Sequence, residues 1–141
     1  MRHLLITRAP MQAMTGSSLL LGLLVAAGAG PAFAQSDAWH LYEKSDGVEV
    51  YYAVRISRDE ARVSWKCVNA NSTNRSCSVG AGREKIYRCT RDGAPLGLTN
   101  SLGESATVRA SGEYVFPSDF ACRGLGATAV EPYGVRIHIE R

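Results

Sequence analysis

The chain has few histidines and lacks the short motifs from which many catalytic and metal sites are built. It has three histidines in 141 residues, and two of them, His40 and His138, are ninety-eight positions apart. No serine lies in a G-x-S-x-G or S-x-x-K motif, and no C-x-x-C pair is present to begin a zinc or redox site. These absences favour a protein that is not an enzyme and that binds no metal ion or cofactor.

The chain also lacks an apolar run of the length, about 20 residues, that a membrane-spanning helix needs. Its longest run, residues 19–29, follows Arg2 and Arg8 and precedes the small-x-small sequence Ala32-Phe33-Ala34. This order is typical of a cleaved signal peptide. We therefore predict that residues 1–34 are removed, that no transmembrane anchor remains, and that the protein is periplasmic or secreted.

An excess of one charge is missing as well. Without Arg2 and Arg8, the sixteen Lys and Arg fall to fourteen, against thirteen Asp and Glu. Overall charge therefore gives no support for a nucleic-acid partner, and we predict none. The charge is uneven along the chain, because residues 55–91 hold nine basic and three acidic side chains.

Residues 35–141 show no 3.6-residue hydrophobic period, which argues against helices. Apolar residues instead alternate with polar ones over residues 48–56, 61–67 and 135–139. Turn residues separate these stretches, and residues 91–104, with Asp92-Gly93, Pro95 and Gly97, are expected to form a long connection. The pattern predicts one all-β domain over residues 35–141, an antiparallel immunoglobulin-like β-sandwich of about seven short strands.

The four cysteines all follow the predicted cleavage site, and an even number in an exported chain favours two disulfides. Three connectivities are open to them. We prefer the pair Cys67 and Cys77, which closes a polar loop, with the pair Cys89 and Cys122, which ties a middle strand to a late segment. The two disulfides would staple the predicted sandwich together.

A candidate binding face follows from the predicted hairpin over residues 48–68. Its outward positions include an aromatic residue among cations: Tyr51, Arg55, Arg62 and Lys66. Such a face suits an anionic glycan, another anionic component of the cell envelope or an acidic protein surface. The alternative is that these cations only solvate the sheet and guard its edge.

A candidate binding loop follows the same hairpin at residues 69–76. It is rich in side chains that bond their own backbone, which predicts a loop rather than a strand. Its candidate binding residues are Asn69, Asn71, Asn74 and Arg75.

Two short motifs carry family resemblances. Tyr87-Arg88-Cys89 looks like the Tyr-x-Cys of immunoglobulin domains, although Trp65 precedes Cys67 where that family places its tryptophan after the first cysteine. The same motif, followed by Ser111-Gly112-Glu113-Tyr114, is similar to periplasmic lysozyme inhibitors, which are small, exported, disulfide-closed β proteins. The cysteine layout departs from theirs.

The sequence therefore supports two hypotheses of function. The first is an exported, non-catalytic binding domain whose partner the sequence does not identify. The alternative, implied by the second resemblance, is a secreted inhibitor of a lysozyme- or protease-type hydrolase.

Overall fold

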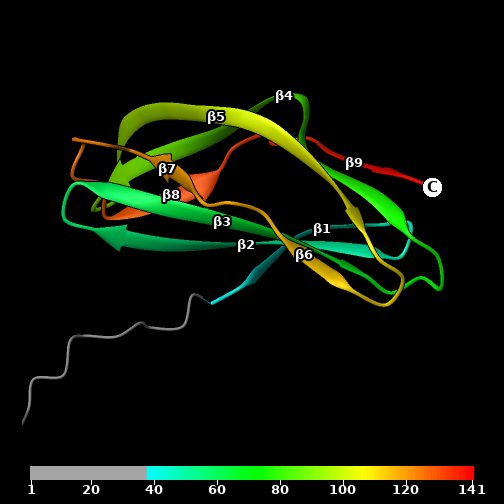
Figure 1. The fold of residues 1–141 in the computed structure, drawn as a ribbon. Coiled ribbons are helices and arrows are strands. Elements are labelled where there is room, and N and C mark those ends of the chain that lie inside the picture. Colours follow the sequence, from blue (N-terminus) through cyan, green and yellow to red (C-terminus); the bar gives the residue numbers. More distant parts are fainter. Residues whose placement is uncertain (1–37) are drawn as a thin grey trace, which may run out of the picture. The chain divides into compact units, whose positions relative to one another are not determined.

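The computed structural model describes residues 38–141, so the predicted signal peptide, residues 1–34, lies outside the described residues. Residues 38–141 contain nine strands and no helix, which confirms the all-β expectation. No helix in this part of the chain is long and apolar enough to cross a membrane. All strand pairs are antiparallel, and the strands form two sheets (Figure 1).

The first sheet is a meander extended by two short strands. Its members are β1 (His40–Ser45), β2 (Val48–Ser57), β3 (Glu60–Asn69), β6 (Glu113–Val115) and β7 (Asp119–Ala121). Both β6 and β7 pair with β3, one after the other along its length. They therefore share a single strand position beside β3.

The second sheet is built around one long strand. Its members are β4 (Arg75–Arg91), β5 (Ala94–Val108), β8 (Ala129–Pro132) and β9 (Ile137–Glu140). β5 pairs with one edge of β4, while β8 and β9 share the other edge in succession. Nine strands thus occupy seven strand positions, four in the first sheet and three in the second.

The core lies between the two sheets, because both contribute inward side chains to one buried cluster. Trp65 of β3 and Tyr87 of β4 are its largest members, and both are fully buried. Around them lie Val48, Val50, Val63, Val79 and Val108. Each buried valine contributes about 1.5–3 kcal/mol relative to exposure, so the period-two pattern provides much of the driving force.

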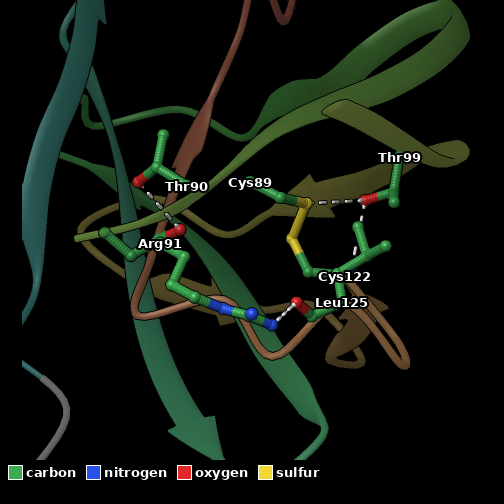
Figure 2. Close-up of a disulfide and its surroundings, with 7 residues drawn as sticks. Cys89, Thr90, Arg91, Thr99, Cys122 and Leu125 are labelled. Carbon is green, nitrogen blue, oxygen red and sulfur yellow. Dashed lines mark hydrogen bonds between the residues drawn. A yellow bond between two sulfur atoms is a disulfide. The ribbon is translucent and has the colours of Figure 1, made fainter. Parts of the chain in front are cut away.

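Both disulfides cross between the sheets, and the preferred pairing is confirmed. Cys67 of β3 is bonded to Cys77 of β4, and Cys89 of β4 is bonded to Cys122, which follows β7. Figure 2 shows the second disulfide beside Thr99, whose hydroxyl accepts a hydrogen bond from the Cys122 amide at 3.3 Å. The chain-entropy model assigns about 3 kcal/mol to the ten-residue separation and about 4 kcal/mol to the thirty-three-residue one.

The expected long connection over residues 91–104 is wrong. β4 and β5 instead form a long hairpin of 17 and 15 residues, joined by Asp92 and Gly93. Both turn residues have positive φ, 49° and 83°, as a type I′ turn requires. β5 is an edge strand with mostly exposed side chains, so it carries no apolar alternation from which it could have been predicted.

A large β-bulge interrupts this hairpin. Val79 faces Glu104 and Glu84 faces Leu102, so residues 80–83 of β4 stand opposite Gly103 alone. A Cβ on Gly103 would overlap the carbonyl oxygens of Gly80 and Arg83. Across the bulge the inward positions of β5 change from odd to even numbers, so Glu104 faces the core side opposite Val79. Lys85 faces the same side because it shares the parity of Tyr87 and Cys89.

Gly103→Ala should destabilise the protein by about 2–3 kcal/mol, because the added methyl group meets backbone that cannot move without breaking the bulge. Gly82→Ala is the matched control. Gly82 has a φ of +63° but open space around its Cβ position, so only about 1 kcal/mol of backbone strain is expected. The free energy of unfolding from urea titrations measures both variants. Equal losses would show that the bulge tolerates a side chain at Gly103.

Candidate functional site

The structure places the four predicted face residues on the outer surface of the first sheet. Tyr51 faces Lys66, and Arg55 faces Arg62, across the β2–β3 pair. Their neighbours of opposite parity, such as Val50 and Trp65, are buried in the core. All four side chains therefore project from the same face, in two cross-strand pairs that are separated by the pair Ala53 and Ser64.

The outer strands extend these two pairs into rows. The first row continues through Leu41 of β1 and Val115 of β6, which lie opposite Tyr51 and Lys66. The second row continues through Phe120 of β7, which lies opposite Arg62. Leu41, Val115 and Phe120 are each 42–56 % exposed, so both rows place exposed apolar side chains together with cations.

Cations lie against aromatic rings in both rows. The Lys66 Nζ is 4.7 Å from the ring centroid of Trp39 and 5.4 Å from that of Tyr51. The Arg62 and Arg123 guanidinium carbons lie 5.0 Å and 4.7 Å from the Phe120 ring centroid. We name this surface the cationic face, and it comprises Trp39, Leu41, Tyr51, Arg55, Arg62, Lys66, Val115, Phe120 and Arg123.

Acidic side chains engage only part of the cationic face. The Glu49 carboxylate accepts hydrogen bonds from Lys44 at 2.7 Å and from the Tyr51 hydroxyl at 2.5 Å. These bonds, the one from Lys44 first, lower the pKa of Glu49 below its ordinary value. Lys66 lies 3.8 Å from Glu113, and Arg123 lies 3.3 Å from Glu60. Among the described residues, no carboxylate forms an ion pair with Arg62, so its charge is directed at solvent.

The asparagine side chains of the predicted binding loop form hydrogen bonds to backbone groups of the protein. Asn69 is buried, and its amide donates to the carbonyls of Thr73, Val108 and Arg109 at 2.9–3.1 Å. The Asn71 amide donates to the Asp46 carbonyl, and the Asn74 side chain accepts from the Ala110 amide. A ligand would have to break these bonds to use the side chains. Arg75 begins β4, and its Nε is buried without a partner among the described residues. The binding role of the loop stays a prediction.

The structure also shows a buried ionic cluster that the sequence did not lead us to expect. The Lys85 side chain is fully buried, and its Nζ lies 2.6 Å from Glu104 Oε2 and 2.9 Å from Asp119 Oδ2. The three side chains come from β4, β5 and β7. The period-two parity of β4 held the clue, because Lys85 shares the inward side with Tyr87 and Cys89.

Two aromatic residues connect this cluster to the centre of the core. The Tyr87 hydroxyl donates to Asp119 Oδ2 and accepts from the Trp65 indole at 2.8 Å. Burial, followed by the bond to Asp119, raises the pKa of Tyr87 well above its ordinary value of 10.0. We name the five side chains Trp65, Lys85, Tyr87, Glu104 and Asp119 the interior network.

The two carboxylates of the interior network are partly exposed to solvent, whereas the lysine is not. Side-chain exposure is 0 % for Lys85, 11 % for Asp119 and 32 % for Glu104. Glu104, on the edge strand β5, is the most exposed of the three side chains. The two carboxylates and one ammonium carry a net charge of −1 when all are ionised.

Other chemistry-bearing residues do not converge. His40 lies on β1 and His138 on β9, in different sheets, and His138 is bonded to Glu140 at 2.9 Å. Within residues 38–141, no three His, Cys, Asp or Glu side chains are arranged to hold a metal ion. A separate pocket of about 500 Å³ is lined by Arg83, Glu84, Ile86, Gly134 and Arg136. The chain has no match among family models, curated proteins or solved structures.

Tyr87→Phe should lower the free energy of unfolding at neutral pH by about 1–3 kcal/mol, because Trp65 and Asp119 each lose a buried partner. The variant should also respond differently to alkali. A tyrosine whose pKa is raised by folding stabilises the native state fully below its unfolded pKa of 10.0, and that contribution is lost as the pH rises further. Above that pH the free energy of unfolding of the wild type should fall by up to about 1.4 kcal/mol per pH unit more than that of the variant.

Urea midpoints from about pH 8 to about pH 11 measure this difference. Tyr133→Phe is the control, since Tyr133 is exposed. Parallel stability curves for wild type and Tyr87→Phe would contradict the assigned role of the hydroxyl.

Proposed function

We propose that this protein is an exported, non-catalytic binding domain that holds an anionic glycan of the cell envelope on its cationic face. Two disulfides support export, because such bonds form and persist in oxidising compartments. We also propose that the two sheets form a sandwich that is immunoglobulin-like in its layers, with four strand positions in one sheet and three in the other. Its connections are distinct, since β1, β2 and β3 follow one another in a single sheet.

The observation that carries the binding proposal is the pair of rows on the first sheet. Aromatic rings stack on the apolar faces of sugars, while guanidinium and ammonium groups bind sulfate, phosphate or carboxylate substituents. The cationic face offers both within single cross-strand rows, as in Arg62 beside Phe120. Solvation of the sheet alone requires no exposed Leu41, Val115 and Phe120 among the cations.

The triple variant Arg55→Ser, Arg62→Ser, Lys66→Ser should bind immobilised heparin at least about tenfold more weakly than the wild type, because it loses three charges and the cation–π contacts of Arg62 and Lys66. Wild-type binding should weaken steeply as salt rises, and this dependence should be shallower in the variant. Equilibrium binding at several salt concentrations measures both effects.

The matched control is Arg83→Ser, Arg109→Ser, Arg136→Ser, which removes the same charge from exposed sites outside the face and includes two residues of the separate pocket. It should bind nearly as well as the wild type. Equal weakening of both triple variants would mean that net charge alone attracts heparin. Retention of an acidic protein but not of heparin would assign the face to a protein partner.

A second candidate function, hydrolase inhibition, is favoured by the exposed segment at residues 109–114. Ser111 is exposed and has a φ of 52°, a left-handed conformation that is costly outside glycine. Its backbone N–H donates to the Asn71 backbone carbonyl at 3.0 Å, and the Gly112 carbonyl accepts from the backbone N–H of Asn69 at 2.8 Å. A strained, preorganised projection beside the half-exposed Tyr114 suits insertion into an enzyme cleft.

If the protein is such an inhibitor, it should inhibit at least one enzyme in a panel of lysozymes and proteases at sub-micromolar concentration. Tyr114→Ala should weaken that inhibition by about tenfold or more, as expected for an aromatic contact at the centre of an interface. Tyr133→Ala, at a similarly exposed tyrosine after β8, is the control and should inhibit normally. No inhibition across the panel would remove this candidate.

A further inference from the structure

The buried lysine of the interior network has no role in the proposed binding function. Lys85 faces the space between the sheets, whereas the cationic face is on the opposite side of β3. A well-packed apolar residue would stabilise such a position as well as a buried ion pair does. Chemistry between the lysine and its two carboxylates gives a reason for these residue types.

The amine and one carboxyl group lie at reacting distance. Lys85 Nζ is 2.9 Å from Asp119 Oδ2 and 3.0 Å from Oδ1, so it stands between the two oxygens rather than beside one of them. The carboxyl carbon that joins them must then lie within about 3.5 Å of Nζ, the range of near-attack geometries. The bulge at Gly103 fixes Lys85, and pairing with Val63 of β3 fixes Asp119.

A proton acceptor lies on the same amine. Glu104 Oε2 is 2.6 Å from Lys85 Nζ, and Glu104 is the most exposed member of the cluster. Proton transfer from the ammonium to this carboxylate replaces a fully buried positive charge and a partly exposed negative one with neutral groups, and the low-dielectric surroundings of Lys85 favour its neutral form. The product is a neutral amine, the form in which a lysine acts as a nucleophile.

A hydrogen-bond donor is directed at the carboxyl group that would be attacked. The Tyr87 hydroxyl donates to Asp119 Oδ2, and Trp65 holds that hydroxyl in place with a bond of 2.8 Å. A fixed donor at this oxygen stabilises the negative charge that develops when the amine adds to the carbon. Fully buried aromatic side chains keep bulk water away from the reacting atoms.

We propose that Lys85 and Asp119 join through an intramolecular amide bond, formed without another enzyme. Lys85 Nζ loses a proton to Glu104 and adds to Asp119 Cγ, and the carbon–oxygen bond to one carboxyl oxygen then breaks. Glu104 delivers its proton to the departing oxygen, which also takes the second proton released by nitrogen and leaves as water. One N–H remains on the amide, Glu104 is again a carboxylate, and no oxidant or cofactor is consumed.

The amide would be a third covalent tie between the sheets, linking β4 to β7 beside the two disulfides. It would also withdraw one positive and one negative charge from the core. The cluster then retains Glu104, whose partial exposure lets water solvate its charge.

The first experiment is mass spectrometry of the purified, exported protein after reduction and alkylation. The reference, called the sequence mass below, is the mass calculated for the exported chain without its signal peptide and with four alkylated cysteines. The intact mass should be lower than this value by one water molecule. Trypsin should fail to cleave after Lys85 and should release residues 84–88 linked to residues 110–123, which contain Asp119. The full sequence mass, with normal cleavage after Lys85, would overturn the proposal. This readout is independent of heparin binding, so either proposal can fail alone.

Variants then test the assigned roles. Glu104→Gln keeps the shape and a hydrogen bond but cannot take the proton, so the linked peptide should fall at least about tenfold in yield. Asp119→Ala should give the full sequence mass. Glu131→Gln, at a surface carboxylate paired with Arg88, is the control and should be linked as in the wild type.

Folding of each variant is checked by formation of both native disulfides. A correctly folded Glu104→Gln protein that is linked to the wild-type extent would overturn the role of Glu104. A linked peptide in Asp119→Ala would overturn the assignment of the acceptor.

Discussion

The attachment of β4 to the opposite sheet is the constraint on which the rest of the structure depends. β4 carries one cysteine of each disulfide, Cys77 near its start and Cys89 near its end. Between these two anchors lie the bulge, Lys85 and Tyr87. Because the ends of this span are covalently fixed across the core, the inward side chains between them meet the first sheet at set positions. The interior network is a consequence of that clamping.

Net charge conceals the organisation of this molecule. The basic excess over residues 55–91 divides between two environments in the fold: Arg62 and Lys66 lie on the outer face of β3, whereas Lys85 is buried among carboxylates. A count of charges along the sequence treats these residues alike. Their opposite surroundings suit the two roles that we propose, attraction of an anionic ligand outside and a reactive amine inside.

Much of the fold could be predicted from the sequence, since period-two alternation identifies β2, β3 and their inward residues, and the cysteine spacing favours the observed pairs. β5 could not be predicted in this way, because an edge strand with few buried side chains leaves no apolar pattern, and Asp92-Gly93 then looks like a break rather than a hairpin turn. The face residues of one hairpin could be grouped by parity. Phe120 and Arg123 could not be added to them, because their proximity depends on a long-range pairing of β7 with β3.

The interior network was missed for a related reason. The parity of β4 places Lys85 inward, but Glu104 turns inward at a bulge whose geometry no local pattern specifies, and Asp119 comes from the other sheet. A lysine is also rarely expected in a core. Only the assembled fold shows that the three groups meet.

The short strand β7 belongs to both surfaces of its sheet. Phe120 points outward beneath Arg62, and the preceding residue, Asp119, points inward to Lys85 and Tyr87. Successive residues of a strand share one peptide unit, so a displacement of one side chain shifts the backbone that carries the other. Because Lys85 and Tyr87 bind the Asp119 side chain, the backbone that carries Phe120 is held in place. In the binding function that we propose, the orientation of the Phe120 ring toward a ligand is therefore set by contacts inside the protein.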